Sequence, residues 1–202
     1  FEEETNLRCQ LVIDRSSSMH FPIQKKLNSK SPNKIGFSIL ASAALMNLFR
    51  RQRDAVGLSI YSDIVHTHTR TRTNIAHHNS LLWELESLAK PFNQKLQEST
   101  SAVEALHEIA ERIHQRSLVI LFSDLLDTQD NDQDFFSALQ HLKYNKHEVI
   151  VFHVVDRSRE LNFEFDARLH KFIDLESGEE LKLNPVELKD EYVTQMTSFE
   201  QE

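Results

Sequence analysis

The chain has 202 residues, a formal net charge of −8 at pH 7, and contents of 40% hydrophobic and 27% charged residues. This length and composition are typical of one globular domain with a full core, and no apolar run reaches the roughly 18 residues of a membrane-spanning helix. The acidic balance disfavours nucleic-acid binding, which needs a basic face. The lone Cys9 excludes an internal disulfide and fits a reducing compartment, so we expect a cytoplasmic location.

Short apolar runs alternate along the chain with segments whose apolar residues recur at helical spacing. In chain order, the sequence predicts a strand at 7–13, a helix at 34–53, a strand at 55–61 with an antiparallel neighbour at 64–69, helices at 74–90 and 101–114, a strand at 117–122, a helix at 132–145 and a buried strand at 148–155. This alternation predicts a doubly wound α/β fold, with a mainly parallel sheet and helices on both faces.

The spacing of apolar residues also predicts which side of each helix is buried. The inward stripe of helix 34–53 is predicted to be Ile35, Ile39, Ala43, Met46 and Leu48. In helix 74–90, which Asn74 caps, the predicted inward residues are Leu81, Leu82, Leu85 and Leu88. Trp83 in the same helix is interpreted as a packing residue.

The pattern changes after Asp156. Segments 169–175 and 181–183 flank a polar Glu-Ser-Gly-Glu turn and predict a β-hairpin, and Pro185 begins a last amphipathic helix that runs to about Phe199. We therefore expect one domain over residues 1–202, in which 157–202 form a C-terminal extension. The chain begins with Phe1 and not with Met, which indicates a piece of a longer protein, and that parent protein could be membrane-associated.

The residues that point most directly to a function follow the first strand. Asp14, Ser16 and Ser18 offer one carboxylate and two hydroxyls on one short loop. Hard oxygen ligands suit a small divalent cation such as Mg²⁺, and sites in open α/β sheets lie beyond the carboxyl ends of the strands. Thr100 and Asp124 are expected at the same edge and complete a candidate metal site of five residues. The alternative is turn chemistry, since Asp and Ser also favour turns and caps.

This set of residues resembles the metal-ion-dependent adhesion site of von Willebrand factor A domains. The resemblance is closer still to one bacterial branch, the domain-of-unknown-function family fifty-eight, and it covers nearly the whole chain. The segments that carry it are residues 1–4, 14–19, 54–58, 61–63, 117–124, 147–156 and 174–179.

The resemblance implies that the chain is a binding module and not an enzyme. Ser16, Ser18 and Thr100 would bind Mg²⁺, or alternatively Mn²⁺ or Ca²⁺, directly, and Asp14 and Asp124 would hold it mainly through water. A partner's Asp or Glu would complete the coordination. The expected partner is a MoxR-type AAA+ ATPase or its client, with no nucleic acid and no membrane contact by this piece of the protein. We expect the metal loop to lie on the surface, so that its residues can be replaced without unfolding the domain.

The sequence departs from the family pattern in three places. Ser17 stands where glycine is usual, Glu98 and Ser99 stand where the family usually has two glycines, and Ser101 stands where the family usually has Asp. Serine tolerates the backbone conformations of glycine poorly. These departures favour, as the first alternative, a metal-free interaction domain whose site has decayed.

Two further alternatives are an enzyme that uses Asp14 differently and a zinc site at histidines elsewhere in the chain. A Mg²⁺-dependent phosphohydrolase would use Asp14 as its nucleophile, but Ser16 stands where that class has a second Asp. A zinc site at His66 and His68 would lack both a Cys partner and a helical His-Glu-x-x-His motif.

Overall fold

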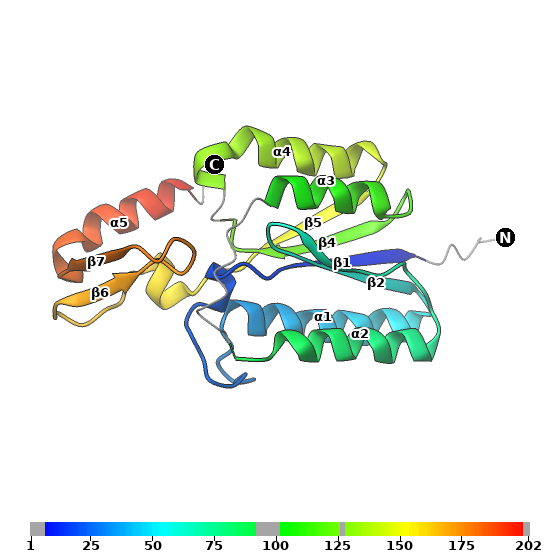
Figure 1. Cartoon of the computed structure of the whole chain (residues 1–202), viewed down its shortest axis with the longest axis horizontal. Helices are drawn as coiled ribbons and strands as arrows, with labels where there is room; N and C mark the ends of the chain where they lie inside the picture. Colours follow the sequence, from blue (N-terminus) through cyan, green and yellow to red (C-terminus); the bar gives the residue numbers. More distant parts are fainter. Residues whose placement is uncertain (1–6, 92–101, 126–127, 200–202) are drawn as a thin grey trace.

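The computed structural model describes residues 7–91, 102–125 and 128–199 and contains a five-stranded sheet with the strand order β3-β2-β1-β4-β5 (Figure 1). Four strands run parallel, and β3 pairs antiparallel with β2 at one edge. The bounds of the strands are β1 Arg8–Asp14, β2 Ala55–Tyr61, β3 Val65–His68, β4 Leu118–Ser123 and β5 Glu148–His153. The prediction of a mixed α/β fold with a mostly parallel sheet is therefore confirmed.

Helices lie on both faces of this sheet. Figure 1 shows α1 and α2 on one face and α3 and α4 on the other. Their bounds are α1 Lys34–Gln52, α2 Ile75–Leu88, α3 Ala102–Arg112 and α4 Thr128–Tyr144. Two of them, α1 and α4, are the crossovers that parallel strands require, from β1 to β2 and from β4 to β5. Within the described part of the chain, no helix is long and apolar enough to cross a membrane.

The first turn of α1 is held against the loop that follows β1. The Asn33 side chain caps the helix by accepting a hydrogen bond from the Gly36 N–H at 3.0 Å. The Lys34 N–H donates to the Phe21 carbonyl at 3.2 Å. Gly36 allows this close approach, because a Cβ at that position would come within 2.5 Å of Leu27 Cδ1. These contacts fix the backbone of Lys34 beside the loop that follows β1.

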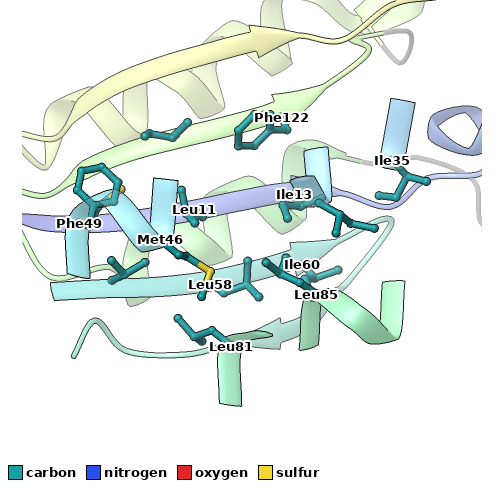
Figure 2. Close-up of a cluster of buried hydrophobic side chains, with 14 of the residues drawn as sticks. Leu11, Ile13, Ile35, Met46, Phe49, Leu58, Ile60, Leu81, Leu85 and Phe122 are labelled. Carbon is teal, nitrogen blue, oxygen red and sulfur yellow. The ribbon is translucent and has the colours of Figure 1, made fainter. Parts of the chain in front are cut away.

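The core has two halves, one on each face of the sheet. Alternation along β1 sends Leu11 and Ile13 to the half under α1 and α2, and Val12 to the half under α3 and α4. Figure 2 shows the first half, in which side chains of the two helices meet those of three strands. Its labelled members are Leu11, Ile13, Ile35, Met46, Phe49, Leu58, Ile60, Leu81, Leu85 and Phe122.

Several predicted burials are wrong. The strand predicted to be buried at 148–155 is β5, the edge of the sheet, and its residues 150–152 are exposed because β4 is its one neighbour in the sheet. Leu48, Leu82 and Trp83 also lie on the outside of their helices. Since α1 and α2 carry apolar residues on more than one side, spacing alone does not select the inward side.

A smaller unit follows β5. It consists of a π-helical turn Arg157–Leu161, the hairpin of β6 His170–Ile173 and β7 Glu180–Leu183, and α5 Pro185–Phe199, so the predicted hairpin and last helix are present. Phe163 stacks on Phe172 of the hairpin and on Tyr192 of α5, with ring centroids 5.9 and 4.3 Å apart. Figure 1 places this unit beyond the carboxyl ends of β1 and β4.

Candidate metal centre

The candidate site begins where β1 and β4 end as neighbouring parallel strands. Ile13 pairs with Phe122, so the residues that follow them, Asp14 and Ser123, lie side by side. The Ser123 hydroxyl donates a hydrogen bond to Asp14 Oδ2 at 2.7 Å. Asp124 comes next in the chain, and its charge acts on Asp14. The structure thus brings together the two carboxylates that the sequence predicts for the site.

Asp14 is a buried carboxyl group with an unusual titration. Its side chain accepts a second hydrogen bond, from the Ser16 N–H to Oδ1 at 2.8 Å, and the residue is 2% exposed. Burial raises the pKa of Asp14 to about 7, and the charge of Asp124 adds to the rise, while the hydrogen bonds oppose it. A nearby cation would favour the charged form of such a carboxyl.

The loop after Asp14 is more buried than we expected. Ser16 and Ser17 are inaccessible to solvent, and Ser18 is half-buried. The cause is Met19, which is fully buried in the core and whose N–H donates to the Ser16 carbonyl at 3.2 Å within the 3-10 turn Ser18–His20. The expectation of a surface loop is therefore wrong for all but Ser18.

The two serine hydroxyls of the loop face each other. Ser16 Oγ and Ser18 Oγ are 3.0 Å apart and share a hydrogen bond. Oxygens at neighbouring corners of an octahedral Mg²⁺ site, each about 2.1 Å from the ion, are also about 3.0 Å apart. The spacing of this pair therefore suits both a hydrogen bond and two adjacent metal ligands.

A lysine that the sequence prediction missed lies in the site. Lys34 Nζ is 2.8 Å from Asp124 Oδ2 and 2.5 Å from Glu160 Oε1, and the lysine side chain is 2% exposed. Burial lowers the pKa of Lys34, but the two carboxylates outweigh burial, so the pKa is raised and the ammonium stays charged. The other oxygen of Glu160 accepts the Asp156 N–H at 2.6 Å.

The balance of charge in this buried group suits a divalent cation. Three carboxylates, those of Asp14, Asp124 and Glu160, stand against the single ammonium of Lys34. With all four ionised, the group carries two negative charges, which one Mg²⁺ would neutralise. The donors are hard oxygens, as Mg²⁺ requires. The residues present thus suit a divalent ion by charge and donor type, but within the described part of the chain these three carboxyl groups are not grouped so that they could hold one ion by themselves.

The remaining predicted metal ligand and the zinc alternative are not supported by the described residues. Thr100, together with Ser99 and Ser101, lies outside the described residues. Among the described residues, no three His, Cys, Asp or Glu side chains are grouped as a metal site, so a metal would depend on the serine hydroxyls. The same finding gives no support to zinc at His66 and His68, whose rings bond instead to the hydroxyls of Ser62 and Ser59.

A groove opens beside the site. It is lined by Ser18, Phe21, Lys34 and Glu160 together with residues 174–176 of the hairpin turn, and its volume is about 370 Å³. The turn is well formed, because Asp174 Oδ1 accepts the N–H groups of Glu176 and Ser177. The hairpin therefore forms a wall of the approach to Ser18.

Two solved structures share this fold along most of their length. One is described as an aerotolerance-related membrane protein from Bacteroides fragilis with multiple mutations to serines; it is 14% identical, with a TM-score of 0.59, and the match covers 94% of this chain and 87% of that one. The other is the conserved hypothetical protein BatB from Bacteroides thetaiotaomicron, which is 15% identical, with a TM-score of 0.55 and coverage of 94% and 86%. At these identities the likeness shows the fold alone. No curated protein matches this chain.

Family membership comes from the sequence. A family model described as "Protein of unknown function DUF58" matches residues 1–202, which is the whole chain. The match agrees with the resemblance to family fifty-eight that the segments around Asp14 and Asp124 carry. The chain therefore belongs to the DUF58 family.

Proposed function

We propose that this chain is a non-enzymatic protein-interaction module of the von Willebrand factor A type, with a metal-ion-dependent adhesion site. Ser16, Ser18 and Thr100 would hold Mg²⁺, Mn²⁺ or Ca²⁺ directly, and Asp14 and Asp124 would hold it mainly through water. The bound ion would supply a Lewis-acid position for a carboxylate of a partner protein. The observation that carries the proposal is the buried Asp14–Asp124 pair at one sheet edge, beside two serine hydroxyls at ligand spacing.

The groove beside Ser18 supports this function. Ser18 is half-buried and lines the groove, whereas Ser16 and Asp14 are buried and are not among its lining residues. The hairpin wall carries Asp174 and Glu176, which would repel a partner's carboxylate in the absence of a cation. A divalent ion at the serines would reverse that repulsion locally, so binding is expected to require the ion.

A second candidate function rests on Lys34. Its ammonium already contacts both Asp124 and Glu160, as a structural cation would. In this version the chain is a metal-free interaction domain, and the charge network holds the extension against the sheet. The two versions differ in whether removing divalent ions weakens partner binding.

The resemblance suggests the partner, and the structural relatives suggest the setting. We infer a MoxR-type AAA+ ATPase or its client as the partner, acting in the cytoplasm. One of the structures with the same fold is described as an aerotolerance-related membrane protein, which is compatible with a parent protein attached to a membrane.

The test is a pull-down with a candidate AAA+ ATPase, in Mg²⁺ and in chelator. It compares the wild-type chain with Ser18→Ala, which removes a half-buried ligand, and with Ser42→Ala as the control. Ser42 is buried on α1, and its hydroxyl has no hydrogen-bond partner among the described residues. We expect retention for wild type and Ser42→Ala in Mg²⁺ only, and loss for Ser18→Ala. Retention that is equal in Mg²⁺ and chelator would support the metal-free function instead.

A further inference from the structure

α1 is apolar on the side that faces away from the sheet. Its buried side includes Ile39 and Met46, yet Phe37, Leu40 and Leu48 are 45%, 36% and 48% exposed. Their spacing of three and eight residues places them on one side of the helix, opposite the core. A helix that is apolar all round is normally covered on all sides.

α2 extends this apolar surface. Ile75, Leu82 and Trp83 are 68%, 45% and 72% exposed. Ile75 and Leu82 lie three residues before and four residues after His78, so they share its side of α2. The opposite side of α2 faces β3, because Glu84, two residues after Leu82, accepts a hydrogen bond from Thr67 Oγ1 of β3 at 3.5 Å. Ile75 and Leu82 therefore point away from β3. The two helices lie together on one face of the sheet (Figure 1).

We name this surface the α1–α2 outer face, defined by Phe37, Leu40, Leu48, Ile75, Leu82 and Trp83. The stretch of sequence that contains this face, residues 21–90, has ten Lys and Arg against four Asp and Glu, a net charge of +6, whereas the whole chain carries −8. One of these four acids, the exposed Glu86, lies four residues after Leu82 on α2. α1 itself has no acidic residue. Exposed basic residues precede and follow the middle of α1: Lys25, Lys26 and Lys30 lie in the loop before the helix, and Arg50, Arg51 and Arg53 lie at its C-terminal end.

We propose that the α1–α2 outer face docks an acidic amphipathic helix of a protein partner. Exposed Phe, Leu and Trp side chains with Arg at the rim are the composition of a protein interface. Two adjacent helices present their apolar residues in rows that fit the i, i+3, i+4, i+7 stripe of a third helix. The basic residues before α1 and at its C-terminal end favour acidic residues beside that stripe. None of the six residues of this face lines the groove beside Ser18 or belongs to the metal site, so the inference does not depend on that site.

The test uses photo-crosslinking in the full-length protein, in the cells that naturally make it. A photo-crosslinking amino acid is placed at position 48 and, as the control, at position 136, where exposed Phe136 lies on α4 of the opposite face. We expect position 48 alone to capture a protein segment whose sequence has apolar helical spacing and flanking Asp or Glu. The proposal would be overturned if position 48 captured a second copy of this chain, a basic or non-helical segment, or lipid alone. It would also be overturned if position 48 captured nothing.

A second measurement uses the captured segment as a synthetic peptide. Trp83 is the only tryptophan of the chain and is exposed, so docking over it should shift its emission to shorter wavelength. We expect Leu48→Ser to weaken peptide binding at least tenfold, Phe136→Ser to leave it unchanged, and raised salt to weaken it. Equal affinity for both variants, at unchanged melting temperature, would contradict the assigned face.

Discussion

Replacing Lys34 with Met tests the charge network of the site. The change keeps most of the volume of the side chain and removes its charge. It leaves Asp124, whose side chain is 4% exposed, and Glu160, which is 18% exposed, without their counter-charge. Removing one partner of a buried ion pair typically costs about 3–5 kcal/mol. Because Glu160 is partly solvated, we expect the lower end, a loss of about 3 kcal/mol in the free energy of unfolding.

The measurement is urea unfolding in chelator, followed by circular dichroism because the exposed Trp83 is a weak reporter of unfolding. Lys171→Met is the matched control. Lys171 pairs with Glu180 at 2.5 Å, but both side chains are about half-exposed, so its loss should cost less than about 1 kcal/mol. The measurement is then repeated in Mg²⁺. Without the ammonium, the site is more negative and should bind Mg²⁺ more tightly, so Mg²⁺ should stabilise Lys34→Met more than it stabilises the wild type.

Two results would refute this reasoning. If Lys34→Met is as stable as Lys171→Met in chelator, the ammonium is not the counter-charge of the buried carboxylates. If Lys34→Met is destabilised but Mg²⁺ gives no recovery, the carboxylates do not form a cation site and the metal-free function is favoured.

Three further outcomes are expected. The pKa of Asp14 is raised from 3.8 to about 7, so between these pH values the folded state keeps a proton that the unfolded state has lost. The free energy of unfolding in chelator should therefore fall as the pH rises toward 7. Urea midpoints measured across this pH range should show a smaller fall for Asp14→Asn. An unchanged slope would contradict the titration of Asp14. Saturating Mg²⁺ should raise the melting temperatures of the wild type and of Ser42→Ala but not that of Ser18→Ala. At a roughly hundredfold excess of Mg²⁺ over its Kd, the expected gain in the free energy of unfolding is about 2.7 kcal/mol. Equal melting temperatures of the wild type with and without the metal would contradict the proposed site. Phe122→Ala should cost about 3–5 kcal/mol, and Phe152→Ala clearly less, because Phe122 is fully buried and Phe152 is 40% exposed; equal losses in urea unfolding would show that β5 is not an open edge.

Much of the sheet could be predicted because strand ends are marked in the sequence. The run before Asp14 and the run before Asp124 are apolar and short, and each ends at a polar residue. Parallel neighbours then bring both carboxylates to the same edge. The same runs do not distinguish a central strand from an edge strand, which is why the exposure of β5 was not predicted.

Lys34 and Glu160 could not be found in this way. A lysine in the first turn of a helix gives no sign of whether its side chain points to solvent or inward. Glu160 lies in an irregular turn after the last parallel strand, 126 residues from Lys34 in the chain. Their contact depends on how the extension folds back over the sheet edge, and no local pattern encodes that.

The ion pairs of Lys34 also have an evolutionary consequence. Its ammonium pairs with Asp124, which follows β4, at 2.8 Å and with Glu160, which lies in the extension, at 2.5 Å. A substitution at position 34 would leave two buried or partly buried acids to be neutralised, whereas a substitution at position 124 or 160 would still leave the lysine one carboxylate partner. Across DUF58 sequences, a loss of the lysine at position 34 should therefore be accompanied by a change at position 124 or 160. A homologue with an apolar residue at position 34 should also have lost an acid at one of the other two.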